Sequence, residues 1–157
     1  MFMQALGVHA AYTKANSFYN TVTAITPFLR ELGYKKVNYT WHKNKQGVTI
    51  LFSVMRDSPQ SITWKYGFGI GIEELSQTRI TKIKHCQLQQ IFRRSRYGYD
   101  WAVHELVAAL DYWEQQYGSL RALNTAAIRK TLPPNTPPNV MKYCAWIDCS
   151  KFDEQLP

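Results

Sequence analysis

The chain has 157 residues, of which 45% are hydrophobic, so it is long enough for one domain with a full core. Charged residues make up 19%, too few for a disordered chain, and no apolar stretch is long and uninterrupted enough to be a membrane-spanning helix. The net charge of +8 favours an anionic partner, either nucleic acid or an acidic protein surface, with plain solubility as the alternative interpretation.

The first predicted element is a helix that begins at Asn16 or Ser17, both of which are good N-caps. Its apolar residues recur at helical spacing, and Gly33 follows as the expected C-terminal cap. Pro27 lies inside this pattern, so the helix should kink there or restart with Thr26 as a new cap. The apolar stripe expected to face the core is Phe18, Val22, Ile25, Leu29 and Leu32.

Four strands are then predicted, at residues 39–43, 48–55, 61–72 and 78–83, with a hairpin turn at residues 44–47. The third strand places aromatic and aliphatic side chains on one face and glycines on the other. Bare glycines are useful where something approaches the backbone closely, so we expect the protein's own helix to pack there, with a partner surface as the alternative. The glycines are Gly67, Gly69 and Gly71.

Two helices should follow the sheet, the first capped by Asp100 and ended by Gly118, the second capped by Ser119 and extending to about Leu132. Residues 133–138 contain four prolines and should form an extended linker. We therefore expect a single α+β domain at residues 1–132, with an antiparallel sheet of about four strands preceded by one helix and followed by two. Residues 133–157 would be a Pro-rich linker and a C-terminal tail that docks on the same domain.

No pattern of catalytic, cofactor-binding or metal-binding residues stands out in the sequence. There is no phosphate-binding loop, and none of the four histidines lies in a recognisable nucleophile signature. His85 and Cys86 are adjacent, which is poor spacing for a zinc site completed by Cys144 and Cys149. We expect no catalytic residue, no metal and no cofactor. The weaker alternative is an enzyme with a pocket lined by His85 or His104.

The best candidate for partner binding is the segment at residues 93–99, RRSRYGY, which we expect to be a loop. Its arginines can grip phosphates or carboxylates, and its tyrosines can stack on bases or pack in a protein interface. Two lysines just before it extend the same charge, and a solvated basic loop is the alternative interpretation. The candidate partner-binding residues are Arg93, Arg94, Arg96, Tyr97, Tyr99, Lys82 and Lys84.

The expected location is the cytoplasm, away from any membrane. The first five residues have neither the basic nor the long apolar region of a signal peptide. The cysteines are three in number and form no CxxC pair, which argues against a secreted disulfide scaffold.

Residues 27–36, PFLRELGYKK, resemble the N-terminal helix of a family of small bacterial domains of unknown function, which reads roughly PxLKxxG[FY]KK. The HCQLQQI run at residues 85–91 is similar to the segment after the sheet in that family. The resemblance covers about residues 17–125 and implies an α+β fold without a known enzymatic activity. Small bacterial domains of this kind often include toxin-immunity proteins, so the resemblance adds that role by analogy.

Taken together, these features predict a non-enzymatic protein-binding module, in the form of an immunity protein that binds and neutralises a bacterial toxin domain. The partner is expected to have the acidic contact surface. The alternative is a nucleic-acid-binding protein that uses the Arg/Tyr segment on phosphates. Salt dependence distinguishes the two, because each phosphate contact steepens the loss of affinity with salt.

Overall fold

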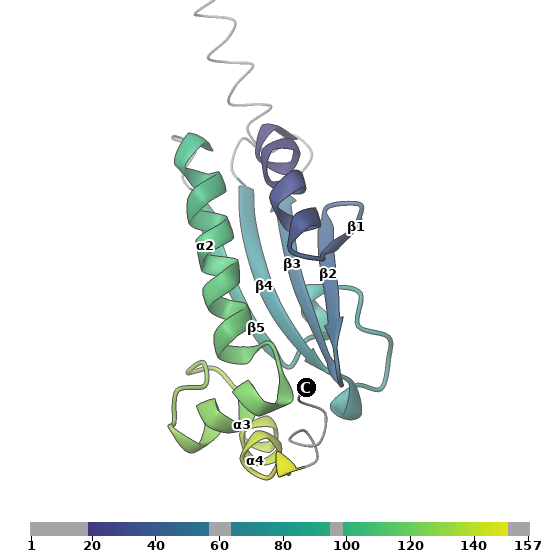
Figure 1. The fold of residues 1–157 in the computed structure, drawn as a ribbon, viewed down its shortest axis with the longest axis vertical. Coiled ribbons are helices and arrows are strands. Elements are labelled where there is room, and N and C mark those ends of the chain that lie inside the picture. The colour runs from purple at the N-terminus through teal and green to yellow at the C-terminus, as the bar shows by residue number, and fades with distance from the viewer. Residues whose placement is uncertain (1–18, 57–63, 95–98, 151–157) are drawn as a thin grey trace, which may run out of the picture.

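The chain forms a five-stranded antiparallel sheet with one helix before it and three after it, which confirms the α+β class (Figure 1). The computed structural model describes residues 19–56, 64–94 and 99–150. Strands that are neighbours in sequence pair in space, so the sheet is a meander. Its strands are β1 (Lys35–Val37), β2 (Thr40–Lys45), β3 (Val48–Arg56), β4 (Trp64–Ile72) and β5 (Leu88–Arg94).

The central strands β2, β3 and β4 were predicted, but the prediction of a strand at residues 78–83 was wrong. Its two isoleucines, Ile80 and Ile83, are three residues apart, a spacing that suits a tight helical turn better than a strand of period two. Ile83 in fact begins the short 3₁₀ helix η2 (Ile83–His85). The fourth predicted strand is replaced by β5, which lies further along the chain, and the three-residue β1 was not predicted.

The N-terminal helix is continuous over residues 19–31, so it does not restart at Pro27. The hydroxyl of Thr26 donates a hydrogen bond to the carbonyl oxygen of Val22, 2.5 Å away, inside this helix. Gly33 ends the helix as predicted, with a φ of 92° that a side chain would disfavour. The predicted start at Asn16 or Ser17 lies outside the described residues.

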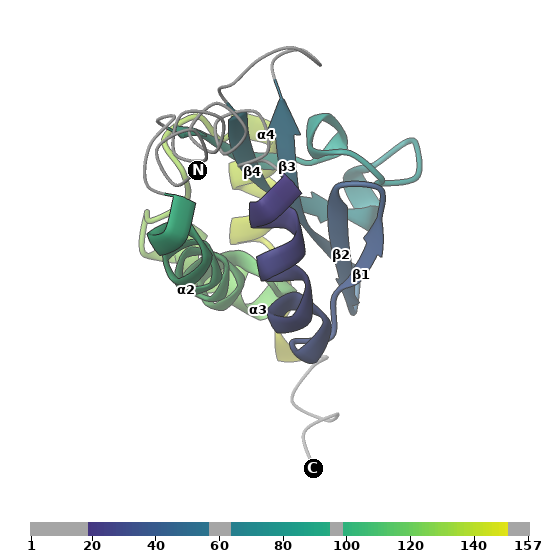
Figure 2. The same ribbon diagram turned by 90° about the horizontal axis from the view of Figure 1, so that it is seen from above.

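The main core lies between one face of the sheet, here called the inner face, and two helices that both cover it (Figure 2). These are the N-terminal helix and α2 (Tyr99–Tyr117). The predicted cap Asp100 is the second residue of α2, so this helix begins earlier than expected. Fully or almost fully buried residues of this core include Ile25, Leu29, Trp41, Phe52, Phe68, Leu106, Leu110 and Trp113.

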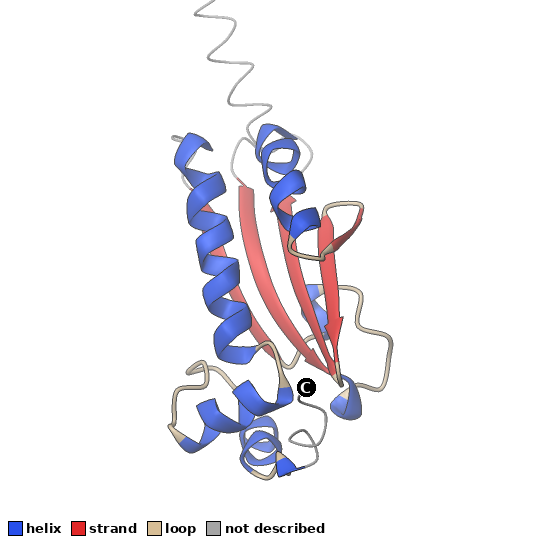
Figure 3. Cartoon of the chain, in the orientation of Figure 1, coloured by secondary structure: helices blue, strands red, loops and turns tan. Residues whose placement is uncertain are grey.

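The C-terminal part adds a helix that the sequence did not predict (Figure 3). Ser119 caps α3 (Leu120–Ile128) as expected, its Oγ accepting a hydrogen bond from the amide of Ala122 at 3.0 Å. The prolines at residues 133–138 do not form one extended linker, because Pro138 is the first residue of α4 (Pro138–Ala145). A first helical residue needs no amide donor, so proline suits that position. Val140 and Cys144 of α4 are buried in the main core.

The opposite face of the sheet, here called the outer face, is covered by the connection between β4 and β5. This connection contains η1 (Glu73–Leu75) and η2. A Cβ atom on Gly69 would lie 2.6 Å from the Sγ of Cys86, and one on Gly71 would collide with Ile80. The glycines therefore do admit a close approach, but the segment that packs on them is an irregular connection of the same chain and not the helix that was expected.

Among the helices in the described part of the chain, none combines the length and the apolarity needed to cross a lipid bilayer. The 19-residue helix α2 buries one stripe against the sheet and exposes charged residues such as Glu105 and Asp111. This amphipathic pattern is that of a helix packed on the surface of a core.

Candidate functional site

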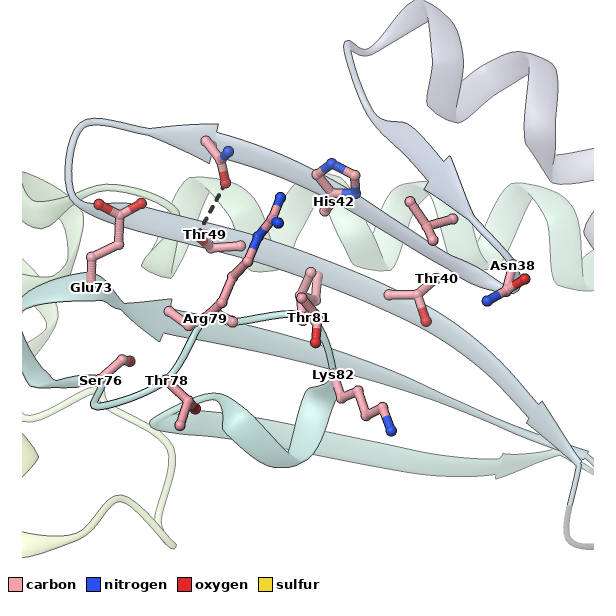
Figure 4. A pocket seen from close by; sticks show the side chains of 14 residues that line it. Asn38, Thr40, His42, Thr49, Glu73, Ser76, Thr78, Arg79, Thr81 and Lys82 are labelled. Atoms are coloured by element: carbon pink, nitrogen blue, oxygen red, sulfur yellow. Dashed lines mark hydrogen bonds between the residues drawn. The ribbon is translucent and has the colours of Figure 1, made fainter.

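The outer face carries a groove with a volume of about 660 Å³, here called the outer groove (Figure 4). One wall is formed by β1, β2 and the turn between them, and the other by the connection from β4 to β5. The floor is formed by β3, through Thr49 and the fully buried Leu51. Side chains on the walls include Asn38, Thr40, His42, Asn44, Glu73, Ser76, Thr78, Arg79, Thr81 and Lys82.

The groove residues of β2 are set by the alternation of the strand. Trp41 is buried in the main core and Lys43 contacts α2, so both point to the inner face. Thr40, His42 and Asn44 alternate with them and therefore line the outer groove. Within the groove, the hydroxyl of Thr49 donates to the Oδ1 of Asn44 at 3.0 Å, which ties the floor to the wall.

The opposite wall is held in place by Gln87, whose side chain bridges the two ends of the connection. Its Oε1 accepts a hydrogen bond from the amide of Ile72 at 2.6 Å, and its Nε2 donates to the Oγ of Ser76 at 2.9 Å. The Ser76 hydroxyl in turn donates to the carbonyl oxygen of Ile72 at 2.9 Å. These three bonds close the base of the connection, so the residues between Ser76 and Gln87 are held as a loop above the sheet.

The far part of the connection is braced by His85 and Cys86. The Nδ1 atom of His85 accepts hydrogen bonds from the amides of Thr81 and Lys82, both at 3.3 Å, so this imidazole serves the loop. The thiol of Cys86 donates to the carbonyl oxygen of Lys82 at 3.7 Å. Burial raises the pKa of Cys86 to about 12, so it is a protonated thiol at neutral pH and not a nucleophile.

Arg79 is the most prominent charge in the outer groove. Its side chain extends from the connection across the groove toward β2, and the guanidinium lies between Thr49 and His42 (Figure 4). Arg79 and Lys82 are exposed, and neither forms an ion pair with any residue that the structure describes. Glu73 lies at the end of the groove away from Lys82 and is the one acidic residue among the described residues of the lining.

On the inner face, by contrast, positive charges are paired with a carboxylate. The residues involved are Glu114, Lys43, Lys45 and Tyr34, here called the Glu114 cluster. The Oε1 of Glu114 accepts hydrogen bonds from the Nζ of Lys43 at 2.9 Å and from the Nζ of Lys45 at 2.7 Å. Its Oε2 accepts from the hydroxyl of Tyr34 at 2.8 Å. Burial alone would raise the pKa of Glu114, but the three hydrogen bonds outweigh it and hold that pKa below its usual range.

Most of the partner-binding residues proposed from sequence lie in or beside regular structure. Lys82 lines the outer groove, and Lys84 is exposed on η2. The expectation of one loop at residues 93–99 was wrong, because Arg93 and Arg94 end β5 and Tyr99 begins α2. In the sheet, Arg93 pairs with Lys65 and Arg94 with Trp64, at the end of β4 away from Glu73. Arg96 and Tyr97 lie outside the described residues.

Sequence reasoning missed Arg79, His42 and the polar row that contains His42. Arg79 was assigned to a strand that does not form, and His42 was considered only as one of four histidines outside any nucleophile signature. The available signal was the alternation of Thr40, His42 and Asn44 with the inward residues of β2, which marks a polar face on a strand that is buried on its other side.

A second hollow and the buried cysteines are weaker candidates for a functional site than the outer groove. His104 lies with Phe28 and Asp111 along an open hollow of about 400 Å³ between the N-terminal helix and α2. Cys86 packs on the outer face and Cys144 in the main core, so the sheet separates them. In residues 19–56, 64–94 and 99–150 no three potential ligands gather in a way that could hold a metal ion.

Comparisons with protein-family models, with curated proteins and with solved structures find no match for this chain. The functional argument therefore depends on the geometry and charge of the outer face. The resemblance of residues 27–36 and 85–91 to small bacterial domains stays an expectation from sequence.

Proposed function

We propose that this protein is a non-enzymatic protein-binding module that covers an acidic surface of another protein with the outer face of its sheet. The observation that carries this proposal is the outer groove, in which Arg79 and Lys82 are exposed without an ion-pair partner among the described residues. Charges arranged in this way are solvated in the free protein and can be matched only by an anionic partner.

The distribution of charge along the chain supports the same conclusion. Residues 35–94, which contain the whole sheet, include eleven Lys/Arg and three Asp/Glu. Two of these lysines, Lys43 and Lys45, are neutralised by Glu114 on the inner face. Among the other basic residues, Lys36 and Arg56 lie over aromatic rings. Arg79 and Lys82 are exposed without an ion-pair partner in the described structure, which favours a role of these two charges in recognition.

The chemistry of Cys86, Cys144 and His85 supports binding rather than nucleophilic catalysis by these three groups. Burial raises the pKa of Cys86 to about 12 and that of Cys144 to about 11, so both are protonated at neutral pH. His85 already uses Nδ1 to brace the connection. A nucleophile needs a lowered pKa or an adjacent base, whereas the pKa values of the Cys86 and Cys144 thiols are raised.

An immunity protein that neutralises a toxin domain is the specific form of this proposal that the sequence resemblance suggests. Inhibitors of nucleases tend to be acidic because they imitate nucleic acid, whereas this chain carries a net charge of +8. The partner would therefore have an acidic contact surface or an activity other than nucleic-acid cleavage.

The test is affinity capture of the tagged chain from its native host, with and without nuclease, and at low and moderate salt. The informative variant is the double charge reversal Lys82→Glu, Lys84→Glu on the outer side. Its matched control is Arg129→Glu, Lys142→Glu, which changes the net charge by the same amount at two exposed positions, the C-cap of α3 and the surface of α4.

We expect a stoichiometric protein that survives nuclease, is released by the outer double reversal and is retained by the control. An acidic contact surface on that protein would complete the support. Nucleic acid alone, lost at moderate salt, would replace this proposal with the nucleic-acid alternative. Retention of the protein by the outer double reversal would place the interface elsewhere.

A further inference from the structure

On the basis of the proposed function, we infer that the outer groove takes an extended acidic segment of the partner protein, with Arg79 anchoring a carboxylate of that segment. This assigns a specificity-determining residue and a ligand class to the groove. It goes beyond a general attraction between a basic and an acidic surface.

The shape of the groove favours a single extended chain. Along β2 the groove is lined from Thr40 to Asn44, about 13 Å of extended chain, and the turn residue Asn38 continues the lining beyond the strand. Its volume of about 660 Å³ lies within the range of sites for small molecules and short peptides. A lining of this length along a strand suits an extended segment of about five residues better than a rounded metabolite.

The middle of the groove is rich in hydrogen-bond donors. The guanidinium of Arg79 presents a planar pair of N–H groups that fits a carboxylate with two parallel hydrogen bonds. Asn44 already accepts the Thr49 hydroxyl proton through Oδ1, which leaves its amide group to donate to a ligand. The preferred ligand at this position is therefore an acceptor with negative charge, which in a protein segment is Asp or Glu.

The two ends and the floor of the groove further restrict the segment. Glu73 lies at one end and Lys82 on the same wall beyond Arg79, so the segment should place a basic or neutral residue near Glu73 and its acidic residues near Arg79 and Lys82. Ile80 on one wall, which is half-buried, and the exposed Val37 on the other supply apolar contacts for aliphatic side chains between the charged ones.

Single-stranded nucleic acid is a poorer match for this lining. Proteins that hold single strands combine basic residues with aromatic side chains on which the bases stack. The described lining of the outer groove contains no Phe, Tyr or Trp. The sheet's aromatic side chains Trp41, Phe52 and Phe68 are instead buried in the main core.

The experiment is fluorescence anisotropy with a labelled octapeptide that carries two central Glu residues separated by Val and only neutral residues elsewhere, compared with the same peptide carrying Gln in place of Glu. Glutarate serves as a free dicarboxylate competitor, and a labelled octathymidylate serves as the nucleic-acid probe. The variant is Arg79→Gln, and the matched control is Arg129→Gln, which removes one exposed arginine at the end of α3.

The Glu peptide should bind the wild-type chain at least about tenfold more tightly than it binds R79Q, as expected for a charge-assisted hydrogen-bonded pair. R129Q should bind like the wild type, and the Gln peptide should bind as weakly as the Glu peptide does to R79Q. Equal affinity of R79Q and R129Q, or no binding of the Glu peptide to the wild type, would overturn the inference. Competition by glutarate at concentrations similar to that of the peptide would indicate a small-molecule site. Arg79-dependent binding of octathymidylate would indicate a nucleic-acid site. Either result would also overturn the inference.

The capture experiment separates this inference from the proposed function. If R79Q keeps the captured protein while the double reversal of Lys82 and Lys84 releases it, the protein-binding function stands and the assignment of Arg79 fails. If R79Q releases the protein and R129Q keeps it, both stand.

Discussion

Among the residues that the structure describes, positive charges are paired on one face of β2 and unpaired beside the other. On the inner face Lys43 and Lys45 share the carboxylate of Glu114, whereas on the outer face Arg79 and Lys82 border a groove without an ion-pair partner in the described structure. All four residues add to the same net charge of +8. The comparison shows that a count of charges does not distinguish those that stabilise the fold from those available to a partner.

The physical difference between the two sides is solvation. Only 12% of the Glu114 side chain and 25% of the Lys43 side chain are exposed, so removing one partner there would leave charge in a poorly solvated site. Arg79 is exposed, so water stabilises its charge in the free protein. Its interaction energy is therefore gained on binding rather than on folding.

The largest effect is expected from breaking the Glu114 cluster. Glu114→Gln keeps the volume of the side chain but leaves Lys43 and Lys45 together without a counter-ion, which should destabilise the fold by about 2–3 kcal/mol. Urea unfolding monitored by tryptophan fluorescence measures this loss. Glu105→Gln, on an exposed turn of the same helix, is the matched control and should change the free energy of unfolding by less than about 0.5 kcal/mol. Equal effects of the two variants would contradict a stabilising role for the cluster.

A smaller loss of stability is expected when the connection between β4 and β5 is pushed away from the outer face. Gly69→Ala would bring a methyl group against the Sγ of Cys86, so the connection must shift, at a cost of about 1–2 kcal/mol. The matched control is Gly67→Ala, whose new methyl would meet the flexible end of Met55 at 3.2 Å and Ile83 and Ile91 at 3.5 Å. Thermal unfolding should show a lower midpoint for G69A than for G67A. If both variants unfold like the wild type, the connection is not packed on the glycine face as described.

Acid should reproduce part of the loss caused by E114Q. The pKa of Glu114 is lowered in the folded chain, so its contribution to stability is complete above the ordinary carboxyl pKa near 4.5 and is lost as the pH falls through the folded-state value. The protonated carboxyl still hydrogen-bonds its neighbours, so the loss should be smaller than that of the substitution. Urea unfolding from pH 7 down to pH 3 should bring the wild type and E114Q closer together. A constant difference over that range would assign the stabilisation to something other than the charge of Glu114.

The smallest effect on stability is expected from the outer groove. Arg79→Gln removes an exposed charge without an internal partner in the described structure, so the free energy of unfolding should change by less than about 0.5 kcal/mol. The same urea titration that measures E114Q provides this value. A loss as large as that of E114Q would show that Arg79 stabilises the fold, and the contrast between the two faces of β2 would disappear.

Local patterns were sufficient for much of the fold but failed where they were short or interrupted. The Ser119 cap, the Gly33 end and strands β2 to β4 follow from residue type and periodicity. In β5 the glutamines Gln89 and Gln90 interrupt the apolar alternation, so this strand was missed. The isoleucines at 80 and 83 mimicked a strand because their burial comes from packing on the glycine face, which no local period reveals.

By itself, the sequence determined the α+β class, the basic character of the sheet region and the two opposite rows of side chains along β4. These depend on neighbouring residues, through period, capping and turn chemistry. The tertiary structure alone decided that the inward row of β2 lies next to the carboxylate of Glu114 and that its outward row lines the outer groove. Glu114 lies 71 residues from Lys43, and Arg79 comes from a connection that was predicted as a strand, so both contacts depend on how distant segments pack. Packing is selected by the burial of the whole core, and no local stretch of sequence contains that information.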